Sequence, residues 1–197
     1  MRITKVYTRT GDAGRTRLAG GQQVWKDSLR VDVYGTVDEL NAVVGVVRAF
    51  NADGIGKRAS AARLERELRW VQNKLFDAGG ILATAPGQTF QNMPRITAKD
   101  VKRLEQVIDS CQKDLAPLKE FILPGGGKVA AFLHHARTVC RRAERECVRL
   151  SREEPIDPGI VKFLNRLSDA LFVLARWAVK LQGGQELLWE RTGGGLT

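Results

Sequence analysis

Hydrophobic residues recur at every third or fourth position through most of the chain beyond residue 35, which is the pattern of amphipathic helices. Thr36 followed by Glu39 is the signature of a capping box, and it predicts that a first helix begins there. Ser60 is placed to cap a second helix, along which leucine and valine repeat at helical spacing. The first half of the chain therefore predicts two long helices.

The second half of the chain continues the helical pattern after a proline-containing loop over 84–95. Thr97 with Asp100 predicts the start of a third helix. A proline- and glycine-rich turn then precedes a long fourth helix over 128–153 and a fifth helix over 158–184. Five helices with short connections and almost no strand content predict an all-α, up-and-down five-helix bundle.

The first 35 residues do not share this pattern. Residues 3–8 are β-prone, and the segment that follows them, TRTGDAGRTRLAGGQ, has four glycines and no helical periodicity. No repeat or linker divides the chain, so we expect a single domain of 197 residues. Within it we expect an N-terminal loop over 1–35, the helical bundle over 36–184 and a tail over 185–197.

Charge narrows the classes of partner. The chain has 32 Lys and Arg against 22 Asp and Glu, a net charge of +10, which predicts an anionic partner: nucleic acid, an acidic membrane surface or a phosphorylated small molecule. No stretch approaches the roughly 20 apolar residues needed to cross a bilayer. Three cysteines cannot form a closed set of disulfides, and the N-terminus lacks the apolar core of a secretory signal, so we expect a cytoplasmic protein.

The fourth predicted helix has a row of arginines beside its apolar stripe. Arg137, Arg141, Glu144 and Arg145 fall within about a quarter-turn of one another at helical spacing. The guanidinium group is planar and binds phosphate or carboxylate through two parallel hydrogen bonds. A solvated basic face with Glu–Arg pairs has the same pattern, and the spacing alone favours that interpretation.

The glycine-rich N-terminal segment is a second candidate for binding an anion. It is not a Walker P-loop, because no Gly-Lys-Ser/Thr follows. A flexible turn would have the same composition, so the segment alone does not decide between the two. Its candidate groups are the hydroxyls of Thr8, Thr10 and Thr16, the charges of Arg9, Arg15 and Lys26, and the backbone at Gly11 and Gly14.

The remaining polar residues carry weaker signals. Asn165, Asp169 and Arg176 share one stripe of the fifth helix and are candidates for a polar wall. Asp38 is expected in the first turn of the first helix, where the helix dipole favours a carboxylate. No His, Cys or carboxylate spacing indicates a metal site held by the protein, and Cys140 and Cys147 fall in the core stripe.

Five segments taken in order resemble the motifs of the PduO-type ATP:cob(I)alamin adenosyltransferases. They are YTRTGDAGRTRLAGG, RVDVYGTVDELNAVVG, FILPGG, ARTVCRRAER and FLNRLSDALFVLAR. The resemblance spans nearly the whole chain, and five ordered motifs at compatible spacing are far more specific than any one alone. Two departures fall in the first motif, where Arg9 and Ala13 stand at positions that are usually lysine.

The resemblance implies a homotrimer of five-helix bundles with ATP between neighbouring subunits. It implies that Co(I) of a reduced corrinoid attacks the 5′ carbon of ATP and that triphosphate leaves, with Mg²⁺ accompanying the nucleotide. A cobalamin reductase and an adenosylcobalamin-dependent client enzyme are the partners that this chemistry implies, with neither nucleic acid nor a membrane involved.

The resemblance also implies roles for single residues. Arg141, Arg137 and Asp38 would form the catalytic set, with Arg137 and Asp38 joined as an ion pair, and Phe121 would lie against the corrin. The residues that would bind ATP are Thr8, Arg9, Thr10, Gly11, Arg15, Thr16, Lys26, Arg141, Arg142, Glu144, Arg145 and Asn165. Two other functions stay open: a basic helical protein that binds nucleic acid, and a non-catalytic carrier or sensor of ATP or corrinoid.

Overall fold

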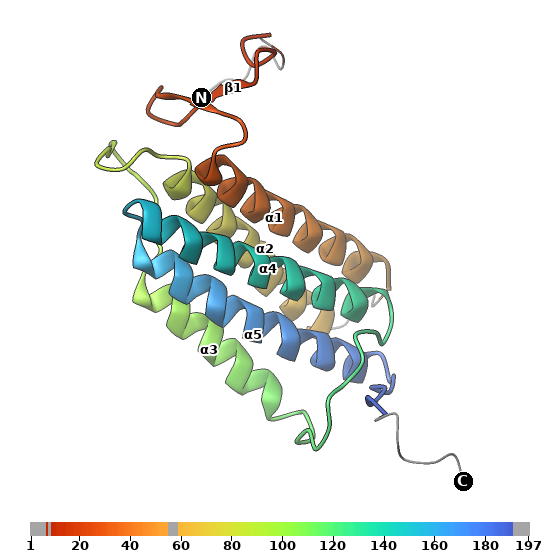
Figure 1. The fold of residues 1–197 in the computed structure, drawn as a ribbon. Helices are drawn as coiled ribbons and strands as arrows, with labels where there is room; N and C mark the ends of the chain where they lie inside the picture. The colour runs from red at the N-terminus through yellow and green to blue at the C-terminus, as the bar shows by residue number, and fades with distance from the viewer. Residues whose placement is uncertain (1–6, 8, 55–58, 191–197) are drawn as a thin grey trace.

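The computed structural model describes residues 7, 9–54 and 59–190 (Figure 1). Within these residues a short hairpin precedes five helices. The helices run alternately up and down, as the sequence predicts. The elements are β1 (Arg15–Arg17), β2 (Gln23–Trp25), α1 (Leu29–Gly54), α2 (Ala59–Leu82), α3 (Ala98–Gln112), α4 (Lys128–Glu153) and α5 (Pro158–Leu181).

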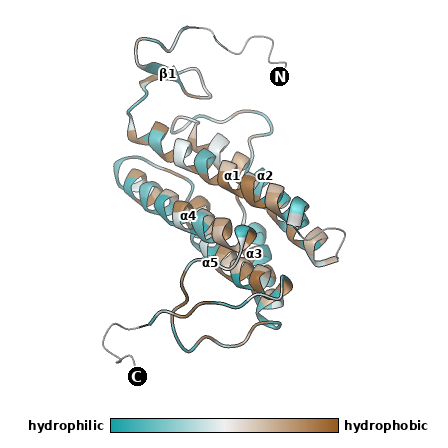
Figure 2. Ribbon diagram, turned by 90° about the vertical axis from the view of Figure 1, so that its right-hand side faces the viewer, coloured by the Kyte–Doolittle hydropathy of each residue, from teal (hydrophilic) through white to brown (hydrophobic). Residues whose placement is uncertain are grey.

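The helices pack as a bundle in which α4 contacts α1 and α5, α2 contacts α1, and α3 contacts α5. Hydrophobic and hydrophilic positions alternate along the helix ribbons, as amphipathic helices require (Figure 2). Large side chains that are fully buried, among them Leu40, Leu133 and Phe163, form one continuous core. This burial supplies most of the free energy that stabilises the bundle.

The predicted start of the first helix is wrong by seven residues, because α1 begins at Leu29 and not at Thr36. The backbone N–H groups of Val31 and Asp32 already donate to the Ser28 carbonyl. Thr36 is inside the helix, where its hydroxyl donates to the Asp32 carbonyl at 3.0 Å. A threonine that bonds back along its own helix has the same sequence context as a cap, which explains the error.

The predicted cap of the second helix is wrong, because α2 begins at Ala59 and Ser60 is already inside it. The fifth helix ends at Leu181, three residues before the predicted end.

The remaining boundaries agree with the sequence. The capping box at Thr97 is confirmed, since its backbone N–H donates to the Asp100 carboxylate at 2.8 Å. The fourth helix has the predicted bounds. At the start of α5 the Asp157 carboxylate accepts from the Gly159 N–H at 2.8 Å, and Pro158 occupies the first turn.

The N-terminal segment contains a hairpin that the sequence did not predict. Its two strands have three residues each and pair antiparallel, with Arg15 opposite Trp25. Three residues are too few to display an alternating pattern, so the strands were hidden in the glycine-rich loop. The β-prone residues 3–8 lie outside the described residues except for Tyr7. One hydrogen bond, from the Ala19 N–H to the Ala83 carbonyl at 2.8 Å, joins the hairpin to the end of α2.

The described part of the predicted tail, residues 185–190, pairs with the rest of the chain. Residues 187–189 pair with residues 121–123, in the loop between α3 and α4. The Leu123 N–H donates to the Leu187 carbonyl at 2.8 Å, and the Trp189 N–H donates to the Phe121 carbonyl at 2.7 Å. This pairing joins segments 66 residues apart, which no local pattern reveals.

None of the five described helices combines the length and the hydropathy of a membrane span.

Candidate functional site

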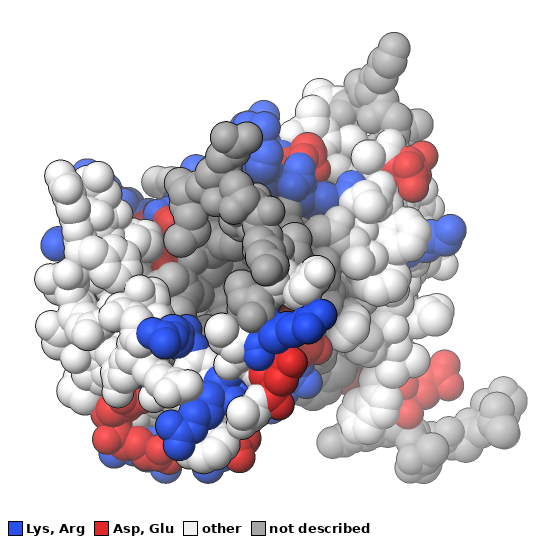
Figure 3. All heavy atoms as spheres, turned by 90° about the horizontal axis from the view of Figure 1, so that it is seen from above, with Lys and Arg blue, Asp and Glu red and all other residues white. Residues whose placement is uncertain are grey.

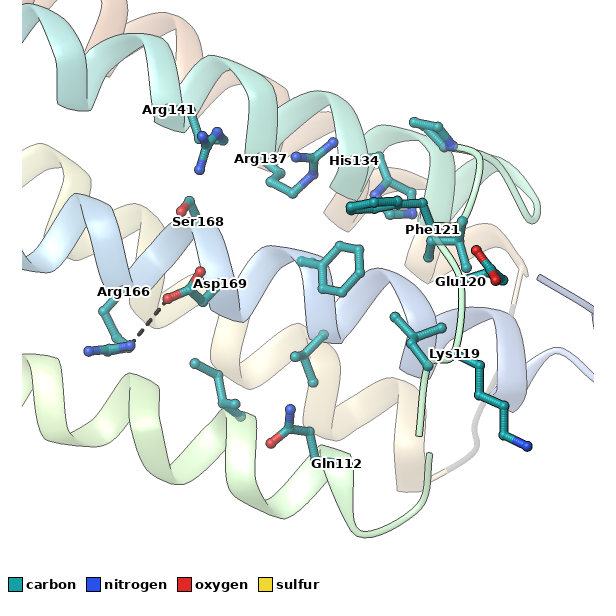
Figure 4. Close-up of a pocket in the computed structure, with 16 residues that line it drawn as sticks. Gln112, Lys119, Glu120, Phe121, His134, Arg137, Arg141, Arg166, Ser168 and Asp169 are labelled. Atoms are coloured by element: carbon teal, nitrogen blue, oxygen red, sulfur yellow. Dashed lines mark hydrogen bonds and ion pairs between the residues drawn. The ribbon is translucent and has the colours of Figure 1, made fainter. Parts of the chain in front are cut away.

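A cavity of about 800 Å³ opens beside α5, between α4 on one side and α3 on the other (Figure 4). The loop that precedes α4 closes one end of it. Its lining comes from the three helices and this loop, and includes Gln112, Phe121, His134, Arg137, Arg141, Arg166, Ser168, Asp169, Phe172 and Val173.

One wall of this cavity, the larger of two described here, is aromatic and apolar. Phe121 is 78% exposed, and its ring meets the edge of Trp189 at a centroid distance of 6.3 Å. Phe172 packs edge-on against His134 at 5.9 Å. Flat apolar surface of this kind suits a large ring system, because burying it releases water from both partners.

The α4 side of the cavity is cationic. Arg137 and Arg141 project from α4 into the cavity (Figure 4). The Nε of Arg137 is buried and has no hydrogen-bond partner among the described residues. Burial, and then the neighbouring Arg141 guanidinium, lower the pKa of Arg137. Both causes disfavour the positive charge of Arg137. An anion bound beside Arg137 would compensate that charge, so the pair would stabilise each other.

His134 lies deeper in the same cavity. It is nearly buried, and its Nδ1 has no hydrogen-bond partner among the described residues. Burial lowers the pKa of His134, and Arg137 lowers it further, whereas the carboxylate of Glu186 acts in the opposite direction. The imidazole is therefore neutral at physiological pH.

A second cavity of about 430 Å³ lies along the C-terminal half of α4 and is lined mostly by polar residues. It is lined by Arg141, Glu144, Arg145, Val148, Arg149, Arg152 and Asn165. Asn165 on α5 donates to the Glu144 carboxylate at 2.9 Å and so links the two helices. Arg141 lines both cavities and therefore stands between the apolar space and the cationic one.

The structure brings many of the predicted residues together. Arg141, Glu144, Arg145 and Asn165 share the polar cavity, while Phe121, Arg137 and Arg141 share the larger one. Several lining residues were not predicted from the sequence: Arg149, Arg152, His134, Arg166 and Phe172. Arg149 and Arg152 could have been found, because they continue the stripe of Arg141 and Arg145 on α4 at helical spacing.

Two predicted residues of the helical face lie elsewhere in this chain. Arg142 forms an ion pair with Glu39 of α1 and lines neither cavity. Asp38 is exposed on α1 and makes no ion pair with Arg137 among the described residues. Because α1 begins at Leu29, Asp38 is also not in the first turn, so the helix dipole does not explain it.

The predicted polar stripe of α5 is divided between three surroundings. Asn165 lines the polar cavity, and Asp169 lines the larger cavity, where it pairs with Arg166 at 3.2 Å. Arg176 lines neither of these cavities and is buried against the C-terminal segment. The shared stripe therefore does not form one wall.

The charged groups of the glycine-rich segment lie beyond the N-terminal end of α1, where the hairpin lies. A Cβ built on Gly11 would lie 3.1 Å from Lys26 Nζ, so glycine allows the lysine amine to cross the turn. The Arg15 guanidinium stacks on the Trp25 ring at 4.4 Å. Arg9 has a φ of 61°, and Thr16 lies in β1. Thr8 lies outside the described residues.

None of the hairpin residues described by the structure lines either cavity. Seen from the hairpin end, basic side chains are interspersed with acidic ones and form no continuous basic face (Figure 3). Among the described residues, no group of three or more His, Cys, Asp and Glu is placed to hold a metal ion. Cys140 and Cys147 are buried, as predicted, and burial raises the pKa of Cys147 to about 12.

The sequence matches the model of one protein family, described as cobalamin adenosyltransferase, over residues 6–178. The chain is 43% identical over 188 residues to the corrinoid adenosyltransferase of Bacillus subtilis (strain 168), which covers 95% of this chain and 93% of the relative. It is 39% identical over 191 residues to the corrinoid adenosyltransferase of Homo sapiens, which covers 95% of this chain and 74% of the relative.

Solved structures agree with these matches. A variant PduO-type ATP:corrinoid adenosyltransferase from Lactobacillus reuteri, complexed with cobalamin and ATP, is similar with a TM-score of 0.86 and 38% identity. That similarity covers 95% of this chain and 97% of the other. A second variant of that enzyme, complexed with ATP, has a TM-score of 0.83 and 38% identity, covering 94% of this chain and 100% of the other.

Proposed function

The chain belongs to the cobalamin adenosyltransferase family and transfers the 5′-deoxyadenosyl group of ATP to the cobalt of cob(I)alamin, and we propose that the transfer takes place where its two cavities meet. The corrinoid occupies the larger cavity, against Phe121. The nucleotide occupies the polar cavity. The observation that carries this assignment is that Arg141 lines both spaces.

The reaction needs positioning and charge stabilisation more than proton transfer. Co(I) is already a strong nucleophile, and its electron pair forms the new cobalt–carbon bond to the 5′ carbon. The bond from that carbon to the phosphate oxygen breaks, and triphosphate carries away the electron pair. Arg141 stabilises the charge that develops on this leaving group, and the two cavities hold the reactants in line.

Neighbouring residues share the nucleotide. Arg145 contributes a second guanidinium, and Glu144 and Asn165, joined by their hydrogen bond, face the ribose. Arg137 lies beside Arg141 in the larger cavity and takes part in the transfer there. Arg142 is paired with Glu39, and the nucleotide contact predicted for it stays a prediction.

We propose that the hairpin completes the site of a neighbouring subunit in a homotrimer. Arg9, Arg15 and Lys26 are exposed, and none of the described residues of the segment lines either cavity, which supports a contact between chains. In this arrangement the segment grips the phosphates through Thr8, Arg9, Thr10, Gly11, Arg15, Thr16 and Lys26. The same contact allows Asp38, exposed on α1, to reach Arg137 of the adjacent subunit, whose Nε has no hydrogen-bond partner in the described part of its own chain.

Phe121 keeps the lower face of the cobalt free of an axial ligand, which makes Co(II) easier to reduce. Its ring is largely exposed at the edge of the larger cavity, as a contact with the corrin requires. Mg²⁺ enters as Mg-ATP, because phosphate oxygens and water are the ligands that it prefers. A cytoplasmic location, a cobalamin reductase and an adenosylcobalamin-dependent client enzyme complete the proposal.

Complementation between two impaired variants tests the shared site, with ATP held near the KM of the wild type, where Lys26→Ala is expected to have little activity. Lys26→Ala and Arg141→Ala are purified separately, then co-expressed, and adenosylcobalamin formation is followed anaerobically by its visible spectrum with Mg-ATP and chemically reduced cobalamin. In randomly mixed oligomers about a quarter of shared sites have both residues intact, so about a quarter of wild-type activity should return. No recovery from mixed oligomers would show that both residues act within one chain.

A further inference from the structure

A buried ion pair joins the end of the bundle to the C-terminal segment. Arg176 on α5 is only 7% exposed, and its Nε lies 2.7 Å from the Glu186 carboxylate. A second guanidinium nitrogen donates to the same carboxylate at 3.1 Å and to the Ala116 carbonyl at 2.9 Å. One side chain therefore fixes Glu186 and also the start of the loop that carries Phe121.

Residues 186–189 are here called the strap. After Glu186, the strap pairs with the loop that carries Phe121. The Leu123 N–H donates to the Leu187 carbonyl, and the Trp189 N–H donates to the Phe121 carbonyl at 2.7 Å. The Trp189 ring meets Phe121 edge-on. The strap thus holds Phe121 through its backbone and through its ring.

The far end of the loop is held as well. Gly126 approaches α5 so closely that an added Cβ would lie 2.3 Å from Val179 Cγ2. The loop is therefore fixed at Ala116 and at Gly126, with Phe121 between them and mostly in solvent. An exposed aromatic side chain has little packing of its own to define its position, so the backbone contacts must define it.

We propose that the Arg176–Glu186 ion pair locks the strap and so positions Phe121 over the corrinoid cavity. Arg176 and Glu186 are positioning residues, since neither lines the larger cavity. The inference rests on the proposed role of Phe121. It predicts that loosening the pair affects the corrinoid and its cobalt coordination while the polar cavity that binds ATP is untouched.

The test compares Glu186→Gln with Glu190→Gln, a matched change at an exposed position of the same segment. Steady-state KM is measured for each substrate, and electron paramagnetic resonance of cob(II)alamin bound with ATP reports how much cobalt lacks a lower axial ligand. We expect Glu186→Gln to raise the corrinoid KM about tenfold. It should also remove most of the signal of cobalt without a lower axial ligand, here called the four-coordinate signal. ATP KM should stay within about twofold, and Glu190→Gln should match the wild type.

A second pair of variants guards against simple unfolding of the first. Trp189→Ala and Trp189→Pro both remove the ring, but only proline also removes the N–H that donates to Phe121. The positioning role predicts a smaller four-coordinate signal for Trp189→Pro than for Trp189→Ala. Equal signals in this pair, together with a wild-type corrinoid KM in a folded Glu186→Gln, would overturn it.

Phe121→Ala separates this proposal from the function on which it rests. If Phe121→Ala changes the cobalt spectrum and Glu186→Gln does not, the positioning role is wrong and the corrinoid site stands. If neither variant changes the spectrum, the placement of the corrinoid against Phe121 is wrong, and the role of the strap is lost with it.

Discussion

The face formed by α4 and α5 and the N-terminal hairpin both present cationic groups, but they are built differently. On the helical face, Arg137 and Arg141 project beside a continuous core, and Asn165 bonds to Glu144 across the two helices. On the hairpin, Arg15 and Lys26 are exposed, and among the described residues one backbone hydrogen bond joins its turn to Ala83, just after α2.

This difference separates two kinds of preorganisation. The bundle sets the positions of its arginines before any ligand arrives, because the helices that carry them are fixed by packing. The hairpin presents its charges with few contacts of its own, so a partner or ligand must contribute to their final arrangement. We therefore expect helical residues to affect the chemical step and hairpin residues to affect ATP binding.

Arg141→Ala should have the largest effect. Removing a donor that stabilises a leaving group typically lowers turnover by about 10²–10³, and Arg141 is exposed, so stability should change little. The measurement is kcat for adenosylcobalamin formation together with the thermal midpoint. Arg69→Ala, an exposed arginine of α2, is the control. Turnover like that of the wild type would disprove the role given to Arg141.

Lys26→Ala should have an intermediate effect that appears in a different constant. A charge-assisted hydrogen bond to phosphate contributes about 1.5–3 kcal/mol, so ATP KM should rise about ten- to a hundredfold. The corrinoid KM should not change. The control is Lys102→Ala, at an exposed position of α3. An equal rise in both KM values would contradict the division between hairpin and helical face.

His134 should have the smallest effect, and on stability. Because its pKa lies below the ordinary 6.5, the unfolded chain binds more protons as pH falls past that value. The free energy of unfolding should therefore decrease below pH 6.5 until the folded pKa is reached, by at most about 1.4 kcal/mol per pH unit. Urea titrations at pH 5 and 7 measure this, and His134→Gln should flatten the dependence relative to His135→Gln. An unchanged pH dependence would contradict the burial argument.

Local signals predicted the helices well where hydrogen bonds close within a few residues. The bounds of α4 and the capping box at Thr97 could be predicted because both depend on neighbours in sequence. The start of α1 was wrong for a related reason: Thr36 satisfies its hydroxyl inside the helix, as a cap would outside it. The strands of the hairpin were too short to display a period.

The candidate site divides in the same way. The helical period of α4 was enough to group Arg137, Arg141, Glu144 and Arg145 on one face. It could not assign Arg142 to Glu39, because that choice depends on which helix packs alongside. Likewise, Asn165, Asp169 and Arg176 share a stripe, yet each meets a different neighbour.

By itself the sequence determined the helical class, the apolar stripes and the arginine row, because side-chain direction along a helix follows from a fixed rotation per residue. Only the tertiary structure decided that Arg141 stands between two cavities and that Phe121 is held by the strap. These features depend on contacts between segments distant in sequence. Such contacts are selected by the packing of the whole chain.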